Sequence, residues 1–242
     1  MPRNPFAPYS PCMFVSLPSR KKPGVRWAAP TLLVLMSLAF LWAYSRPHEA
    51  QRNLWLDWGA LSGGLATPEA WWAALRDGSA LRLFTALFLH ADWAHLLGNL
   101  VFLMIFGPPA ERTMGPWRFL VLFLVGGAMS NLAAVLSVGT PDRVIVGASG
   151  AVSAGIGAYL ALFPGAKLGV VLPLGLFLEF VKAPASLLIG IWAVLQVVFA
   201  YIGPAFGAVA WSAHIAGFLF GVVYALFVRA AIARRLRKRQ GY

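Results

Sequence analysis

Charge is scarce in this sequence of 242 residues, and acidic charge is the scarcest, with 8 aspartates and glutamates against 20 lysines and arginines. Charged residues make up 12% of the chain and hydrophobic residues 60%, at a mean hydropathy of +0.72. Soluble domains carry about 25% charged residues. The composition therefore excludes an ordinary soluble domain and predicts a membrane protein.

Cysteine is almost absent as well, since Cys12 is the only one. A single cysteine excludes a disulfide framework and a Cys/His metal site. The net charge of +12 could in principle indicate nucleic-acid binding. The basic residues, however, lie beside hydrophobic segments, where they set the orientation of a membrane protein. We therefore expect the lipid bilayer as a partner and no nucleic acid.

Long hydrophobic runs are what the chain has in place of charge. Each is close to the roughly 20 residues that cross a bilayer as a helix. The runs are 27–44, 93–109, 117–138, 144–163, 184–202 and 209–228. They predict an all-α polytopic membrane protein, a bundle of six transmembrane helices. The membrane domain would cover residues 27–229, between basic cytoplasmic tails at 1–26 and 230–242.

Two connections interrupt this pattern. Residues 45–89 hold four tryptophans among scattered charges, which is typical of segments at the membrane interface and predicts a long interfacial first loop. Leu168–Phe180 is apolar but short for a span, and it contains Pro173 and Gly175. We expect an interfacial or re-entrant connection there.

Basic residues then orient the bundle, because cytoplasmic loops carry an excess of lysine and arginine. With six spans both termini share one side, which holds fifteen basic residues against five on the other. The termini should therefore be cytoplasmic. We expect an integral multi-pass protein of a bacterial inner (plasma) membrane.

Polar residues fall early in the second, fourth and sixth runs: His95 with Asn99, then Ser149, then His214. In the predicted topology these three runs all cross from outside to inside, so their polar residues share one depth near the outer surface. Ionisable groups inside spans are costly and usually functional. The arrangement predicts one assembled site.

The chemistry of that site follows from its residue types. A serine hydroxyl is a poor nucleophile at neutral pH and needs an adjacent base, for which histidine is the best match. The fourth and sixth runs contain no aspartate or glutamate, so the carboxylate of a triad is missing. The residues predict a dyad of Ser149 and His214.

Small residues at four-residue spacing would let the fourth and sixth helices approach closely. The sixth run has Ala213, Gly217 and Gly221, and the fourth pairs Ala151 with Gly155 and Ser153 with Gly157. Such stripes bring helix backbones together in membranes. They are also common as ordinary membrane packing, so they are necessary for the dyad and not diagnostic of it.

An acyl-transfer site also needs donors for the developing oxyanion. His95 and Asn99, four residues apart, face one side of a helix, and the backbone N–H of Ser149 would lie unpaired at a helix start. His90 lies at the rim of this group. A structural histidine between helices fits His95 alone equally well, and Asp92 fits a helix N-cap.

Three motifs together resemble the rhomboid intramembrane serine proteases: His90-xxxx-His95-xxx-Asn99, Gly147-Ala148-Ser149-Gly150 and His214-xx-Gly217-xxx-Gly221. Gly107-xxx-Glu111-xxx-Gly115 resembles a further, structural motif of that family. The resemblance implies Ser149 as nucleophile, His214 as general base, and His95, Asn99 and the Ser149 amide as oxyanion hole. It implies cleavage in or beside a transmembrane helix of a membrane-protein substrate, without metal or cofactor.

One residue departs from the family pattern. Some rhomboids have a tyrosine four residues after the nucleophile that stacks on the histidine, whereas this chain has Ser153. Its hydroxyl would hold the ring or bind water, and the sequence does not decide which. Residues 202–210, with two glycines and a proline, form either a plain turn or a movable cap on the site.

Two other classes of function compete with a protease. A non-catalytic rhomboid-like protein that binds transmembrane clients would have lost the serine or the histidine, and both are present. A transporter would show inverted repeats and broken spans, which this sequence does not. Cleavage of transmembrane helices near the outer membrane surface is therefore the expected function.

Overall fold

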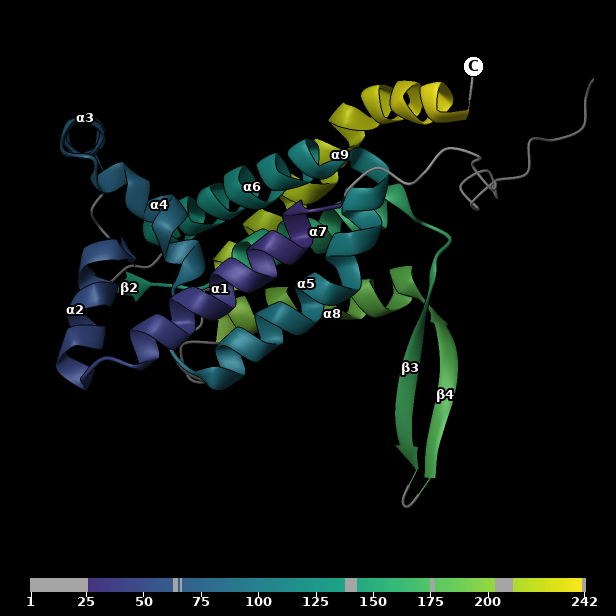
Figure 1. Cartoon of the computed structure of the whole chain (residues 1–242), viewed down its shortest axis with the longest axis horizontal. Coiled ribbons are helices and arrows are strands. Elements are labelled where there is room, and N and C mark those ends of the chain that lie inside the picture. The colour runs from purple at the N-terminus through teal and green to yellow at the C-terminus, as the bar shows by residue number, and fades with distance from the viewer. Residues whose placement is uncertain are drawn as a thin grey trace, which may run out of the picture.

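Six long helices dominate the computed structural model, which describes residues 26–62, 65, 67–137, 143–174, 177–202 and 211–240. They follow the six hydrophobic runs closely (Figure 1). The helices are α1 (Ala28–Tyr44), α5 (Trp93–Met114), α6 (Pro116–Ser137), α7 (Ser149–Leu162), α8 (Ala185–Ile202) and α9 (Trp211–Gln240). The predicted basic tail at 1–26 lies outside the described residues except for Arg26.

Four of these helices, α5, α6, α8 and α9, are long and apolar enough to cross a membrane. The chain is therefore an integral membrane protein. The remaining two are apolar but shorter, 17 residues in α1 and 14 in α7. Helix α7 contacts α5, α6, α8 and α9, and ten of its residues are buried. Six crossings of the bilayer stay a prediction.

The expectation of an all-α protein is wrong at two places, because the described chain also contains strands. β1 (Ala60–Leu61) pairs with β2 (Val144–Ile145), and β3 (Lys167–Leu174) pairs antiparallel with β4 (Phe177–Pro184). The second pair is a hairpin that projects away from the helices (Figure 1). Pro173 lacks an N–H and breaks a helix, whereas an edge strand tolerates it.

The segment 45–89 folds into short helices. They are α2 (His48–Trp58), α3 (Pro68–Asp77), η1 (Ser79–Leu81), α4 (Arg82–Thr85) and η2 (Ala86–Phe88). The Arg82 guanidinium donates to the Leu56 carbonyl at 3.2 Å, and the Thr85 hydroxyl donates to the Trp58 carbonyl at 2.6 Å. These bonds fold the segment back on itself, and β1 attaches it to β2 just before α7. Its position at the membrane interface stays a prediction.

Glu111 ties the start of α1 to α5. Its carboxylate is almost completely buried and accepts from the backbone N–H groups of Trp27, Ala28 and Ala29, each at 2.9 Å. The first amides of a helix have no partner in their own helix, and the helix dipole favours negative charge there. A buried carboxylate is thus fully satisfied in this position.

Backbone contact between α7 and α9 forms the tightest seam in the bundle. A Cβ atom on Gly217 would overlap the Gly150 carbonyl, and one on Gly221 would overlap the Ala154 carbonyl. From the other side, a Cβ on Gly157 would overlap the Phe218 carbonyl. The predicted close approach of these helices is confirmed at those glycines. It is wrong for Gly155, around which the space is open.

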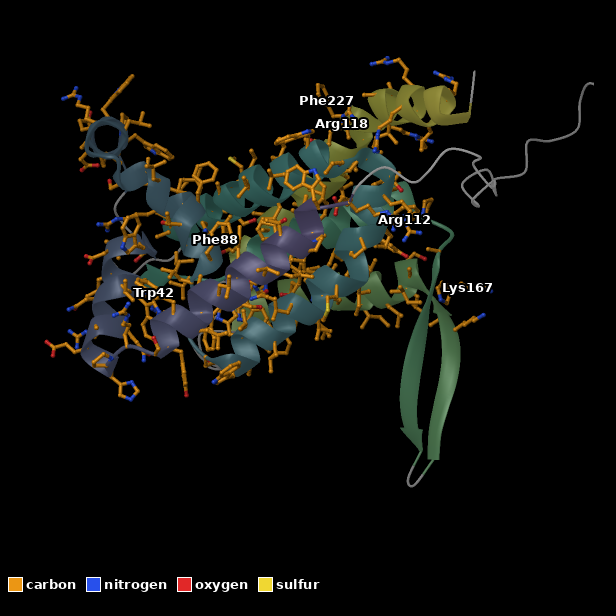
Figure 2. All side chains as sticks on the ribbon, viewed as in Figure 1. Trp42, Phe88, Arg112, Arg118, Lys167 and Phe227 are labelled. Carbon is orange, nitrogen blue, oxygen red and sulfur yellow. The ribbon has the colours of Figure 1, made fainter. Side chains whose placement is uncertain are left out.

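Basic side chains gather at one end of the bundle. Figure 2 shows Arg112, Arg118 and Lys167 at the end where α5 finishes, with Trp42 toward the opposite end. The predicted C-terminal tail continues α9 as far as Gln240, and the Arg235 guanidinium donates to the Thr113 carbonyl at 3.0 Å. The end of α9 is therefore attached to the end of α5.

Candidate active site

Ser149 and His214 lie within hydrogen-bonding distance of each other, with 2.9 Å between the serine Oγ and the histidine Nε2. Ser149 is the first residue of α7, and His214 lies in the first turn of α9. Both are half-buried. The α7–α9 seam brings them together, because the glycine contacts at Gly150 and Gly217 lie within one turn of each.

The turn before α7 sets the direction of the serine. Gly147 has φ +115°, a conformation that residues with a side chain rarely adopt, and a Cβ there would overlap the His95 ring. The Gly147 N–H donates to the Ala86 carbonyl at 2.8 Å. The chain therefore turns sharply, and α7 starts two residues later with its free amides next to Ser149.

His214 has a second polar partner that the sequence analysis missed. Its Nδ1 lies 2.7 Å from Oε1 of Gln196, a buried residue of α8. The Trp211 ring packs edge-on against the imidazole at 5.8 Å. A signal was present, since Gln196 is the only amide or charged residue among the 18 residues of α8. The sequence could not reveal which side chain it meets.

Ser153 uses the proton of its hydroxyl within α7. Its hydroxyl donates to the Ser149 carbonyl, one turn earlier in the same helix, at 2.7 Å. This is the ordinary back-bond of a serine inside a helix. The Ser153 hydroxyl therefore has no proton left to donate to the His214 ring, and the polar partner at Nδ1 of that ring is Gln196.

Asn99 and His95 face the dyad from α5. The Asn99 side chain is buried, and its Nδ2 donates to the His95 carbonyl at 3.0 Å. A primary amide carries two N–H groups, so one remains for a ligand. The predicted N-cap is confirmed, since the Asp92 carboxylate accepts from the His95 N–H at 2.8 Å. The cap fixes the first turn of α5 and with it the His95 backbone.

His90 lies behind the turn that carries the serine. It is buried, its ring is edge-on to His95 at 5.2 Å, and its Nε2 accepts from the Ala148 N–H at 3.5 Å. Burial, reinforced by the neighbouring His95, lowers the pKa of His90 to about 4. A neutral ring with a free lone pair is therefore the form that holds Ala148 in place.

Two cavities meet at the dyad. One cavity, of about 710 Å³, is lined by the C-terminal part of α2, the first turn of α5, the segment 143–149 and the start of α9. It includes Asp92 and Arg143. The other, of about 310 Å³, lies between α5 and α8 and includes Asn99 and Gln196. His95, Ser149 and His214 line both. The predicted cap at 202–210 falls outside the described residues except for Ile202.

A model described as the rhomboid domain matches residues 77–231, which is more than half of the chain. The chain belongs to the rhomboid family. The match contains Ser149, His214, His95 and Asn99, together with the α7–α9 seam.

Several known rhomboid proteins are similar to this chain. The putative rhomboid protease YdcA of Bacillus subtilis is 33% identical over 135 residues, 54% of this chain and 61% of that protein. Rhomboid-like protein 11 of Arabidopsis thaliana, a chloroplastic protein, is 38% identical over 144 residues, 57% of this chain and 49% of that protein. The rhomboid protease GluP of B. subtilis is 33% identical over 102 residues, which is 42% of this chain and 18% of that protein. The matched region thus spans less than two thirds of each relative.

Proposed function

We propose that this rhomboid-family protein is an intramembrane serine endopeptidase that uses Ser149 as nucleophile and His214 as general base. The observation that carries the proposal is the 2.9 Å contact between Ser149 Oγ and His214 Nε2. A serine paired with a histidine in this way is the arrangement that activates a hydroxyl for acyl transfer. Relatives named as rhomboid proteases support the same class of reaction.

The reaction would proceed in two balanced steps. His214 Nε2 takes the hydroxyl proton while Oγ bonds to the scissile carbonyl carbon, and the imidazolium then returns that proton to the leaving amine as the peptide bond breaks. A water molecule next loses a proton to Nε2 and attacks the carbonyl carbon of the acyl-enzyme. As the ester bond breaks, the imidazolium returns that proton to Oγ, which releases the new carboxyl end and restores Ser149 and neutral His214.

Three donors would stabilise the negative oxygen of each tetrahedral intermediate. They are the Ser149 backbone N–H, the second N–H of Asn99 and the His95 ring. Their support is that His95 and Asn99 line the cavity of about 310 Å³ together with Ser149. The free amides at the start of α7 add the positive end of a helix dipole. Gly147 and His90 would act indirectly by holding the turn before Ser149, whereas Ser153 would serve only its own helix.

The substrate we propose is a transmembrane helix of another membrane protein, cut near the outer membrane surface. A peptide carbonyl inside a regular helix is already hydrogen-bonded, so the substrate must unwind locally. The cavity of about 710 Å³ next to β2 has room for an unwound segment. We expect preference for helices weakened by glycine, proline or polar residues, with a small side chain at the cleavage point.

The topology we propose has six spans that cross a bacterial inner membrane, with both termini on the cytoplasmic side. Figure 2 supports it, since Arg112, Arg118 and Lys167 lie at the bundle end opposite α2. An excess of positive charge marks the cytoplasmic side. Helix α7 has only 14 residues, but it is surrounded by other helices and need not match the full hydrocarbon thickness by itself. Its buried N-terminus would place Ser149 below the outer surface.

Covalent labelling tests the proposal without a known substrate. The purified protein is treated with a fluorophosphonate probe, the modified peptide is identified by mass spectrometry, and the variants Ser149→Ala and His214→Ala are compared. We expect labelling at Ser149 in the wild type and none in either variant. A folded wild type that is not labelled would favour a non-catalytic protein that binds transmembrane clients.

A further inference from the structure

Gln196 stands alone on an otherwise apolar helix. The other residues of α8 include no amide and no charge, and its mean hydropathy is 2.2. A side-chain amide in hydrocarbon is costly unless it is hydrogen-bonded. Gln196 is buried, and the partner that the structure gives its Oε1 is His214 Nδ1 at 2.7 Å. The polar atom is therefore directed at the proposed base.

The tautomer of His214 decides whether it can act as that base. Nε2 accepts the Ser149 proton only if it carries none itself, so in the neutral ring the proton must be on Nδ1. An amide oxygen next to Nδ1 accepts from this N–H and favours the required tautomer. A neutral amide does so without placing a second charge inside the membrane.

Helix α8 is also the least buried of the four candidate spans. Within the apolar stretch of 18 residues that could cross the membrane, 17% is buried in α8, against 56% in α6. Val194, Val197 and Val198 are exposed on the surface of the bundle. Ring contacts between described residues of α8 and α9 include Trp192 with Phe218 at 5.9 Å and Phe199 with Trp211 at 4.9 Å. The Gln196 to His214 bond thus joins α9 to a helix that is largely exposed on the surface of the bundle.

We propose that Gln196 is the positioning residue of this site: its amide oxygen holds the Nδ1–H tautomer of His214, so that Ser149 is activated only while α8 is docked against α9. The inference rests on the proposed dyad. It supplies from α8 the orientation of the base that Ser153 does not provide from α7. Because α8 also borders the cavity of about 310 Å³ that reaches Ser149, a displacement of α8 that widens the cavity also removes the partner of the base.

Rates of fluorophosphonate labelling test this role. Gln196→Leu keeps the size and removes the acceptor, and Gln196→Glu keeps an acceptor oxygen. We expect Gln196→Leu to lower the maximal labelling rate on the order of 10- to 100-fold, since general-base catalysis contributes about 10²- to 10⁴-fold. The probe concentration at half-maximal rate should stay unchanged, and Gln196→Glu should recover most of the rate. Val197→Leu, on the exposed face of α8, should label as the wild type does.

Two further readouts separate positioning from a merely structural effect. In ¹⁵N-histidine spectra, Gln196→Leu should shift one ring from the Nδ1–H to the Nε2–H tautomer. Trp192→Ala removes a ring contact between α8 and α9. As a single substitution it should slow labelling, and added to Gln196→Leu it should have little further effect, because the effects of coupled residues are not additive. If Gln196→Leu does not fold, Gln196→Met replaces it.

The outcomes are distinct. Wild-type labelling that Gln196→Leu does not slow would overturn the inference and leave the dyad standing, as would an unchanged tautomer. Additive effects of Trp192→Ala and Gln196→Leu would overturn the link to α8 docking. An unlabelled wild type would instead overturn the proposed function itself.

Discussion

The α7–α9 seam and the α8–α9 contact both hold His214, but with different means. Along the seam three glycines allow direct backbone contact, so that even one methyl group would overlap a carbonyl. Along α8 the contact includes two pairs of aromatic rings and one buried amide. The seam fixes where the histidine lies, and the α8 contact orients its ring. The difference teaches that a rigid scaffold and an adjustable orienting group can be separated within one site.

The largest effect we expect comes from filling the seam. Gly157→Ala would push a methyl group into the Phe218 carbonyl, and overpacking of this kind costs about 1 to 3 kcal/mol, occasionally more. Gly155→Ala is the matched control in the same helix, with open space around it, and should be neutral or stabilising by up to ~1 kcal/mol. Thermal unfolding in detergent measures both. Equal midpoints for the two variants would mean that the backbones are not in contact.

A smaller loss of stability is expected at the far end of the scaffold. Glu111→Gln removes the charge that caps α1 and leaves one acceptor oxygen for three amides, which should cost about 0.5 to 2 kcal/mol. The labelling rate of the folded fraction should not change, because α8 is untouched. Glu49→Gln on the exposed start of α2 is the control. A Glu111→Gln protein that is fully stable but labels slowly would contradict the separation of scaffold from orienting group.

Acid should weaken the scaffold through His90. Its pKa is about 4 in the folded protein against an ordinary value of 6.5, so the unfolded chain binds the proton first as pH falls. This contribution to stability is complete above about pH 6.5 and is lost progressively toward pH 4. His90→Gln should flatten the loss between pH 7 and 5, whereas His48→Gln in an exposed position should not. Unfolding midpoints of both variants are measured across that pH range. If the midpoint of His90→Gln falls with pH as steeply as that of the wild type, His90 is not the source of the acid sensitivity.

The smallest effect is expected at Ser153. Ser153→Ala removes one back-bond to the Ser149 carbonyl and should change the labelling rate by less than about fivefold, in contrast to Gln196→Leu, because a typical hydrogen bond contributes about 1 kcal/mol. The same fluorophosphonate assay compares the two variants. A loss at Ser153 as large as that at Gln196 would place the orientation of the base on α7 and not on α8.

Hydrophobic runs made the helices predictable. All six appear near their expected positions, because an apolar stretch of this length has few other stable forms in a bilayer. Ser149 and His214 stood out for the opposite reason, as polar residues at matched depths in such runs. Both the six helices and the proposed dyad could therefore be predicted from the sequence.

The hairpin and Gln196 were not predictable to the same degree. The run from 168 to 180 lacks any polar period that would mark strands. Its short length, Pro173 and Gly175 argued against a span, but nothing in it indicated a hairpin. A lone amide in an apolar helix predicted that Gln196 has a polar partner. The sequence did not identify that partner, because residue spacing does not fix how a helix is rotated against its neighbours. The same ignorance of rotation explains why Gly155 was wrongly placed in the seam.

Peptide-bond cleavage in a bilayer tests the central claim most directly. The protein would be reconstituted in liposomes with a single-span peptide whose outer end is weakened by a Gly-Pro pair, and the products would be mapped by mass spectrometry. We predict a cut near that outer end which disappears in Ser149→Ala and in His214→Ala and slows when the pair is replaced by leucines. A cut that persists in Ser149→Ala would contradict the account.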